Sequence, residues 1–137
     1  MAALDRFVEA QASVWRDALA ELKAGRKTSH WMWFIFPQIA GLGRSETARF
    51  FAIADAEEAR AFLAHPVLGE RLRKAAAALL AHRGRSAEAV LGGIDAVKLR
   101  SSMTLFEAVA PEEPVFGAVL DAFFAGQRDL ETLRRLG

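Results

Sequence analysis

Apolar residues at the start of the chain recur at steps of three and four, which is the spacing of one face of an α-helix. The positions that follow this spacing are Leu4, Phe7, Val8, Val14, Trp15, Ala18, Leu19 and Leu22. Charged residues such as Arg6, Glu9 and Arg16 fall between them. Gly25 favours a helix end, because glycine adopts left-handed backbone angles without strain. The pattern predicts one amphipathic helix that ends at Gly25.

Residues 31–36 are the most strongly apolar run, and its periodicity does not distinguish a short strand from a buried helical turn. Pro37 ends either element, because proline moves the preceding residue out of the α region. The sequence contains no convincing partner strand, and a lone strand leaves its backbone groups without hydrogen bonds. We therefore favour a helical or irregular conformation here.

Helix-starting and helix-ending residues divide the remainder of the chain into short segments. The expected helix starts are Ser45, Asp55, Pro66, Ser86, Asp95, Pro114 and Asp129. The pattern predicts an all-α protein of about seven helices in an orthogonal array or irregular bundle. At 137 residues, the chain is expected to form a single compact domain over residues 1–137.

The composition, with 53% hydrophobic and 26% charged residues, is that of a globular protein. The formal net charge is only +1, which argues against general nucleic-acid binding. The longest strongly apolar run is too short to span a membrane. The sequence contains no cysteine, which excludes disulfides and thiolate ligands and fits a cytoplasmic protein without an apparent signal peptide.

The segment from His30 to Gln38 combines aromatic rings with polar side chains. Trp31 and Trp33 are suited either to the core or to stacking on the ring of a ligand. His30 is suited to acid–base catalysis or to bonding a ligand, although a half-buried histidine that bonds backbone groups is slightly favoured. The Gln38 amide, beside Pro37, either fixes the loop or binds an amide edge of a ligand.

The glycine-rich turn that follows contains Gly41, Gly43, Arg44 and Ser45. Its backbone N–H groups and Arg44 are suited to binding an anion. The turn lacks the third glycine of a dinucleotide motif and the Gly-Lys-Ser/Thr end of a P-loop. A plain turn in which Ser45 caps the next helix is the more common arrangement.

A second set of polar side chains lies in the predicted helix over residues 95–106. Asp95, Lys98 and Ser102 share one stripe at helical spacing, whereas Ser101 and Thr104 lie off that stripe. Apolar residues occupy several faces of this helix, so we expect the helix to be buried. A buried lysine needs a charge partner, which Asp95 supplies. These residues form either a structural ion pair or part of a ligand site.

The three histidines give no sign of a metal centre. His65 is expected to act as a turn residue before Pro66, and His82 lies near a helix C-terminus, where positive charge is favourable. No histidine is spaced with another histidine or a carboxylate as zinc ligands on one helix face are. Neither a metal nor a cofactor is therefore expected.

A signature extends along most of the chain. It comprises residues 27–38, 41–45, 58–59, 65–69, 71–72, 95, 98 and 101–106. These residues resemble the bacterial protein family defined by domain of unknown function 1810. The resemblance implies a mainly helical single domain without an established activity.

We expect residues 30–45 and residues 95–106 to meet and to form one pocket for a small ligand. The candidate catalytic residues are His30, Asp95 and Lys98. The candidate ligand-binding residues are Trp31, Trp33, Gln38, Arg44, Ser45, Ser101, Ser102 and Thr104. A phosphorylated or nucleotide-derived compound, for example of the ADP-ribose type, suits such a lining, and the pattern does not decide whether the protein is an enzyme. The alternative is a non-enzymatic module whose partly exposed aromatic segment binds a partner protein.

Overall fold

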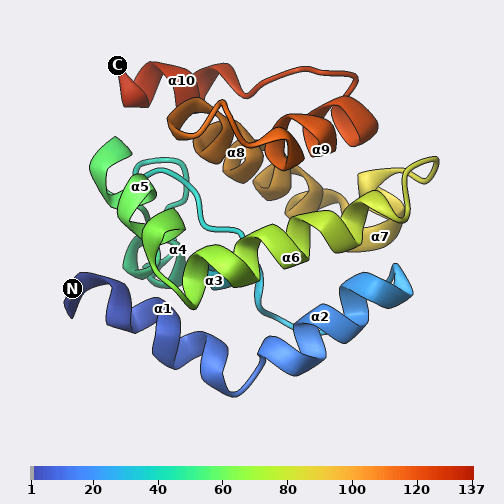
Figure 1. Ribbon diagram of the computed structural model, residues 1–137, viewed down its shortest axis with the longest axis horizontal. Coiled ribbons are helices and arrows are strands. Elements are labelled where there is room, and N and C mark those ends of the chain that lie inside the picture. Colours follow the sequence, from blue (N-terminus) through green and yellow to red (C-terminus); the bar gives the residue numbers. More distant parts are fainter. Residues whose placement is uncertain (1) are drawn as a thin grey trace.

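Ten helices make up the regular structure of residues 2–137, which the computed structural model describes (Figure 1). They are α1 (Ala2–Ala12), α2 (Trp15–Ala24), α3 (Met32–Ile35), α4 (Glu46–Phe50), α5 (Ala56–Ala64), α6 (Leu68–Leu80), α7 (Ala87–Leu91), α8 (Gly93–Val109), α9 (Pro114–Phe124) and α10 (Leu130–Leu136). The all-α prediction is confirmed, although about seven helices were expected. The count is higher because the first predicted helix is divided and because several elements are very short.

The division of the first predicted helix lies between Ala12 and Trp15, where Val14 N–H donates to Gln11 O at 3.1 Å. Gln11 is buried, and its side-chain amide donates to Phe34 O at 2.7 Å. The bend lets α1 pack against α3 while α2 packs against α6. The helical spacing of apolar residues in the sequence therefore continues across the bend, and this spacing alone does not reveal that the helix is divided.

Side-chain caps fix most of the predicted helix starts. Ser45, Asp55, Ser86 and Asp129 each accept a hydrogen bond from the backbone N–H three residues later, at 2.9–3.2 Å. The expectation for Asp95 was wrong. Helix α8 begins at Gly93 after Gly92, which has no side chain, so Asp95 lies inside the first turn and does not cap the helix.

Helix α8 lies at the centre of the molecule and contacts α5, α7, α9 and α10 (Figure 1). Six successive residues of α8, 101–106, are buried, as its all-round apolar sequence predicted. A row of aromatic rings crosses the core from Phe7 to Phe62, Phe106 and Phe116, with centroids 5.1–5.9 Å apart. Helix α8 is thus a rigid support for any side chain that it projects to the surface.

The aromatic segment forms the short helix α3 and then an irregular loop, as favoured from the sequence. Beyond Pro37, Ala40 N–H donates to Ile53 O and Ile53 N–H donates to Gln38 O, both at 2.8 Å. This isolated pair of bonds holds residues 38–40 beside Ile53 without forming a strand. None of the helices within residues 2–137 has the length and apolar character needed to cross a bilayer.

Candidate functional site

The side chain of Trp31 belongs to the core. Its ring is fully buried, and its indole N–H donates to Glu21 Oε1 at 2.9 Å. Glu21 also accepts bonds from Thr28 N–H and from the N–H and hydroxyl of Ser29, at 2.6–3.0 Å. No face of this ring is accessible in the structure, so Trp31 offers no surface for the predicted stacking on a ligand.

The hydrogen bonds to Glu21 hold its carboxylate in the charged form. Partial burial raises the pKa of Glu21, but the bonds from Ser29, Thr28 and Trp31 outweigh burial and lower the pKa from 4.5 to about 2. We call Glu21, Thr28, Ser29 and Trp31 the Glu21 cluster. The four hydrogen bonds to the Glu21 carboxylate all come from residues 28–31, so they fix the connection between α2 and α3.

Asp95 forms ion pairs with two lysines. Its Oδ2 lies 2.8 Å from Lys27 Nζ, and its Oδ1 lies 3.6 Å from Lys98 Nζ. The Asp95–Lys98 pair matches the prediction, whereas Lys27 was overlooked as a partner. Lys27 also donates to Ser29 O at 2.6 Å. Two ammonium groups share one carboxylate, which leaves one positive charge in excess.

Lys98 is the less satisfied of the two lysines. Its Nζ lies 4.5 Å from the centroid of the Trp33 ring, a cation–π contact. The 3.6 Å distance between Lys98 Nζ and Asp95 Oδ1 is that of an ion pair and is too long for a hydrogen bond. The Trp33–Lys98 contact also shows that the two predicted segments meet.

Lys98 lines an open groove of about 430 Å³ between α8, α10 and the loop of residues 38–43, which we call the Lys98 groove. Its lining residues are Gln38, Leu42, Gly43, Ile94, Val97, Lys98, Ser101, Asp129 and Glu131. Ile94 and Val97 are 77% and 66% exposed, unusually high values for large apolar side chains. Of the predicted residues, this groove unites Gln38, Lys98 and Ser101.

The two carboxylates of the Lys98 groove already have partners. Asp129 Oδ2 accepts bonds from Ser101 Oγ at 3.1 Å and from the N–H and hydroxyl of Thr132. Glu131 forms ion pairs with Arg134 and Arg135 at 3.2 and 3.0 Å. Lys98 is therefore the one cation among the residues that line this groove, and its ion pair with Asp95 is long.

A second, much smaller space lies on the inner side of Lys98. Its lining residues include Trp33, Phe36, Gln38, Gly43 and Lys98, and its volume is about 10 Å³. Such a space accommodates about one water molecule. A nucleobase does not fit against Trp33 in this space, so the predicted stacking of a ligand ring on Trp33 cannot take place there.

Two predicted hydroxyl ligands are inside the core. Thr104 is fully buried; its hydroxyl donates to Arg100 O at 2.8 Å and accepts from Asp129 N–H at 3.0 Å. Ser102 is also fully buried, and its hydroxyl has no hydrogen-bond partner among residues 2–137. Neither residue reaches a surface in the structure, so neither offers the ligand contact that the sequence predicted.

Three further predicted residues lie outside the Lys98 groove. His30 and Arg44 are exposed, and neither lines the groove. Ser45 caps α4 by accepting a bond from Ala48 N–H at 3.1 Å. The predicted set of His30, Asp95 and Lys98 is therefore not assembled around one cavity in this structure.

The other histidines have structural positions, as expected. His65 Nδ1 accepts bonds from Val67 N–H and Leu68 N–H at 3.1 and 3.2 Å, at the start of α6. His82 Nε2 lies 2.9 and 3.0 Å from the carbonyl oxygens of Leu22 and Lys23, at the end of α2. Residues 2–137 contain no group of three or more acidic or histidine side chains that could hold a metal ion.

Comparison with known proteins places the chain in a family. A model of the family described as "Protein of unknown function (DUF1810)" matches residues 1–136. The chain belongs to the DUF1810 family. The DUF1810 fold is also seen in the crystal structure of the conserved hypothetical protein Rv1873 from Mycobacterium tuberculosis, with 45% sequence identity and a TM-score of 0.95. That match covers 97% of this chain and 95% of the other chain. No curated protein matches this DUF1810 sequence.

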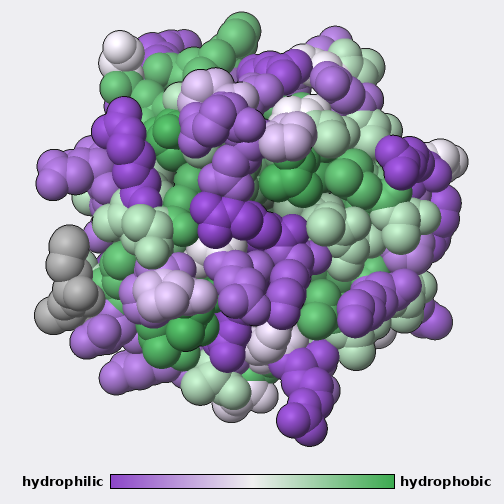
Figure 2. All heavy atoms as spheres, viewed as in Figure 1, coloured by the Kyte–Doolittle hydropathy of each residue, from purple (hydrophilic) through white to green (hydrophobic). Residues whose placement is uncertain are grey.

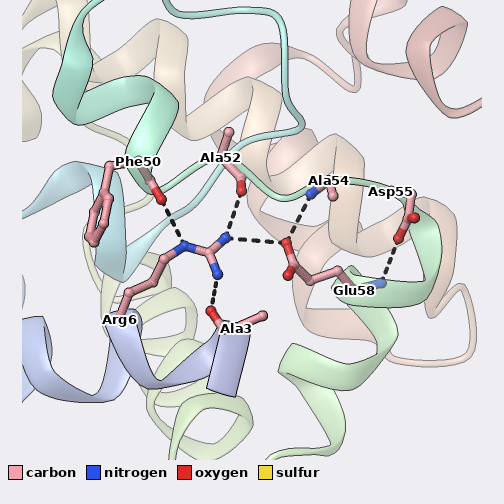
Figure 3. Close-up of polar contacts among 7 residues, drawn as sticks. All are labelled: Ala3, Arg6, Phe50, Ala52, Ala54, Asp55 and Glu58. Carbon is pink, nitrogen blue, oxygen red and sulfur yellow. Dashed lines mark hydrogen bonds and ion pairs between the residues drawn. The ribbon is translucent and has the colours of Figure 1, made fainter. Parts of the chain in front are cut away.

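A further polar network of this DUF1810 protein surrounds Arg6 (Figure 3). Its guanidinium donates to Phe50 O at 2.7 Å, to Ala52 O at 2.8 Å and to Ala3 O. It also donates to Glu58 Oε1 at 3.2 Å. Because most partners are backbone carbonyls, we interpret the network as a structural link between α1 and the connection from α4 to α5.

Several residues that line the Lys98 groove could not be singled out from the sequence. Ile94 and Val97 are apolar, as core residues are, and only the fold shows that they face solvent. Asp129 is the N-cap of α10 and Glu131 lies in its first turn, positions where acidic residues are common for local reasons. The one available signal was the apolar character of α8 on several faces, which exceeds what a single buried stripe requires.

Proposed function

We propose that this DUF1810 protein binds a small amphipathic anion in the Lys98 groove. A carboxylate or phosphate head group would bind Lys98 Nζ, and an apolar body would cover Ile94 and Val97. The observation that carries this proposal is a partly buried ammonium group, paired with Asp95 only at 3.6 Å, beside exposed apolar side chains. Recognition of this kind satisfies the donors and removes apolar surface from water.

The charges around the groove support an anionic ligand. Lys27 already neutralises Asp95 at the shorter distance, so the excess positive charge is located at Lys98. Ile94 and Val97 lie in the first turns of α8, where the helix dipole also favours negative charge. The carboxylate of Asp129 accepts bonds from Ser101 and Thr132, and that of Glu131 pairs with Arg134 and Arg135, so neither carboxylate is the partner of Lys98.

The dimensions of the groove limit the ligand to a small molecule. Its volume of about 430 Å³ lies within the usual range for such sites, roughly 300–1,000 Å³. Nucleotide-derived compounds remain candidates, with the base on the aliphatic wall of Ile94 and Val97 instead of on a tryptophan. We propose binding without a reaction, because His30 does not line the groove.

A thermal-shift experiment tests the proposal with hexyl phosphate, hexanoate, AMP and ADP-ribose, and with hexanol as the neutral control. We expect an anion with an apolar or heterocyclic body to raise the Tm, by about 8 °C at a concentration of roughly 100 Kd. Hexanol and inorganic phosphate should each have a much smaller effect. The Lys98→Met variant keeps the aliphatic stem and should abolish the shift.

Lys74→Met is the matched control, because Lys74 is exposed on α6 and paired only with Glu70. This variant should respond to the same anions as the wild type. Equal shifts in Lys98→Met and the wild type would overturn the proposal, as would a shift with hexanol equal to that with hexanoate.

The alternative, a protein-binding module that uses the aromatic segment, is supported less well. Trp31, Met32, Ile35 and Phe36 are at most 1% exposed. Only Trp33 and Phe34 of the segment's rings are partly exposed, and this surface is small for an interface.

A further inference from the structure

A second groove lies on another face of the molecule, between α2 and α6. Two adjoining hollows of about 540 and 360 Å³ share Leu19 and Lys23. Together they are lined by Trp15, Arg16, Leu19, Ala20, Lys23, Lys74, Ala77, Ala78 and Ala81. We call this surface the α2–α6 groove; it has no residue in common with the Lys98 groove.

The charged side chains that line the α2–α6 groove are all cations. They are Arg16, Lys23 and Lys74, and no carboxylate is among the lining residues. Arg16 and Lys23 form no ion pair within residues 2–137, and Lys74 forms only an exposed pair with Glu70. An exposed pair of this kind contributes little and exchanges readily for another partner. The positive rim is therefore complementary to an acidic partner.

Small side chains line much of the α2–α6 groove. Ala20, Ala77, Ala78 and Ala81 present only methyl groups, so the backbone of a third helix can approach closely. Helices α2 and α6 contact each other and extend for about 15 and 20 Å, the length of three to four helical turns. Figure 2 shows hydrophobic surface bordered by hydrophilic side chains over these helices.

We infer that the α2–α6 groove binds an acidic amphipathic helix of a partner protein. The apolar side of that helix covers Leu19 and the alanines, and its carboxylates pair with Arg16, Lys23 and Lys74. Trp15 borders the groove at one end, where Arg71 stacks on its ring with 5.5 Å between guanidinium carbon and ring centroid. An alanine-lined strip along two packed helices, with cations at its rim, suits an amphipathic helix with carboxylates on its polar side.

The inference is independent of the Lys98 groove and is tested with a synthetic helical peptide. The probe is a fluorescein-labelled peptide of about 14 residues, roughly 21 Å of helix, with leucine and alanine on one face and glutamate on the other. Fluorescence anisotropy measures its affinity for the whole protein. A peptide with lysine in place of glutamate tests the role of charge, and a scrambled peptide of the same composition tests the role of the apolar face.

Two variants locate the binding site. Lys23→Glu reverses a charge on the rim, and Ala77→Trp fills the floor without a change of charge. Each should weaken binding of the acidic peptide at least about tenfold, which corresponds to about 1.4 kcal/mol. Arg49→Glu reverses an exposed charge on α4, outside the groove, and should leave the affinity within about twofold of the wild type.

Several outcomes would overturn the inference. One is equal affinity for the acidic, basic and scrambled peptides, and another is unchanged affinity in both groove variants. Concentration-dependent dimerisation that Ala77→Trp abolishes would assign the groove to a second copy of this chain instead. Binding to phosphatidylserine vesicles without binding to the peptide would assign it to a membrane surface.

Discussion

Glu21 and Lys98 are both charged side chains beside a tryptophan, and their surroundings differ in one respect. Glu21 accepts four hydrogen bonds from the chain, including one from the buried indole of Trp31. Lys98 stacks on Trp33, and its ion pair with Asp95 is long, at 3.6 Å. Glu21 lies at a connection between helices, whereas Lys98 lies at an open groove.

This difference separates a group that the fold needs from a group that the fold leaves available. A charge whose bonds are all made within the chain contributes to the stability of the native state. A charge at a surface whose ion pair is long contributes little to stability but retains interaction energy for a ligand. The two regions should therefore respond in opposite ways to mutation and to added anions.

The largest effect is expected for Glu21→Ala. The change leaves the buried indole N–H and the polar groups of Thr28 and Ser29 without their acceptor. We expect the free energy of unfolding to fall by about 3 kcal/mol in urea denaturation. Glu88→Ala, at an exposed position of α7, should change it by less than about 0.5 kcal/mol. A loss below about 1 kcal/mol for Glu21→Ala would contradict the structural role of the Glu21 cluster.

Acid should remove the same contribution without mutation. The pKa of Glu21 is lowered in the folded state, so the unfolded state binds the proton more tightly than the folded state does. The ionised carboxylate of Glu21 therefore makes its full contribution to stability above pH 4.5. It is lost as the pH falls from about 4.5 to about 2. Because the carboxylate is partly exposed, we expect a loss of about 2 kcal/mol, less than the full pKa shift implies.

The comparison with Glu21→Gln isolates this acid effect, because glutamine does not titrate. The stability advantage of the wild type over Glu21→Gln should shrink over the same pH interval. An advantage that stays constant down to pH 2 would show that the charge of Glu21 is not the cause.

A smaller loss of unfolding free energy is expected for Arg6→Met. This variant tests whether Arg6, a second charged side chain with several hydrogen bonds, stabilises the fold as Glu21 does. The variant keeps an apolar stem but leaves Phe50 O, Ala52 O and Glu58 without their donor. We expect a loss of about 1.5 kcal/mol, measured by urea denaturation. Arg44→Met, at an exposed position, is the control. Equal free energies of unfolding for the two variants would show that the hydrogen bonds of Arg6 stabilise the fold no more than bonds to water do.

Two adjacent serines of α8 give a matched pair with a still smaller effect. Ser101→Ala removes the bond to Asp129 and should lower the free energy of unfolding by about 1 kcal/mol. Ser102→Ala removes a buried hydroxyl without a partner and should be neutral or slightly stabilising. Thermal unfolding of both variants measures the difference. A larger loss in Ser102→Ala would mean that its hydroxyl has a partner, for example a water molecule.

The smallest effect on stability is expected for Lys98→Met, although this variant should lose anion binding completely. The lost cation–π contact and long ion pair together should cost about 0.5 kcal/mol. Calorimetry without ligand measures this value. A loss as large as that of Glu21→Ala would make Lys98 a structural residue and remove the contrast between the two regions.

The fold was predictable where local chemistry decides it. Gly25, with φ of 73°, ends α2, and Ser45, Asp55 and Asp129 start helices because side-chain oxygens cap them. The bend before Trp15 was not predictable, because its cause is the bond from buried Gln11 to Phe34 O, which joins residues far apart in the chain.

The candidate site was predictable only in part, for a similar reason. Helical spacing placed Asp95 beside Lys98, and the choice of segments brought Trp33 next to Lys98. Spacing along one helix does not reveal that Lys27, from another segment, is the closer partner of Asp95. Nor does it reveal which polar side chains are sealed in the core, as Thr104 is, because burial depends on the packing of all neighbouring helices.

The bond between Asp129 N–H and the buried hydroxyl of Thr104 has a consequence for biosynthesis. It anchors α10 to a helix that the ribosome produces earlier, and α10 supplies one wall of the Lys98 groove. Translation therefore completes α5, α6, α8 and α9, which bury most of the core, before it completes the groove. A nascent chain can therefore begin to bury its core before the groove exists, because the groove is complete only when synthesis has passed Glu131.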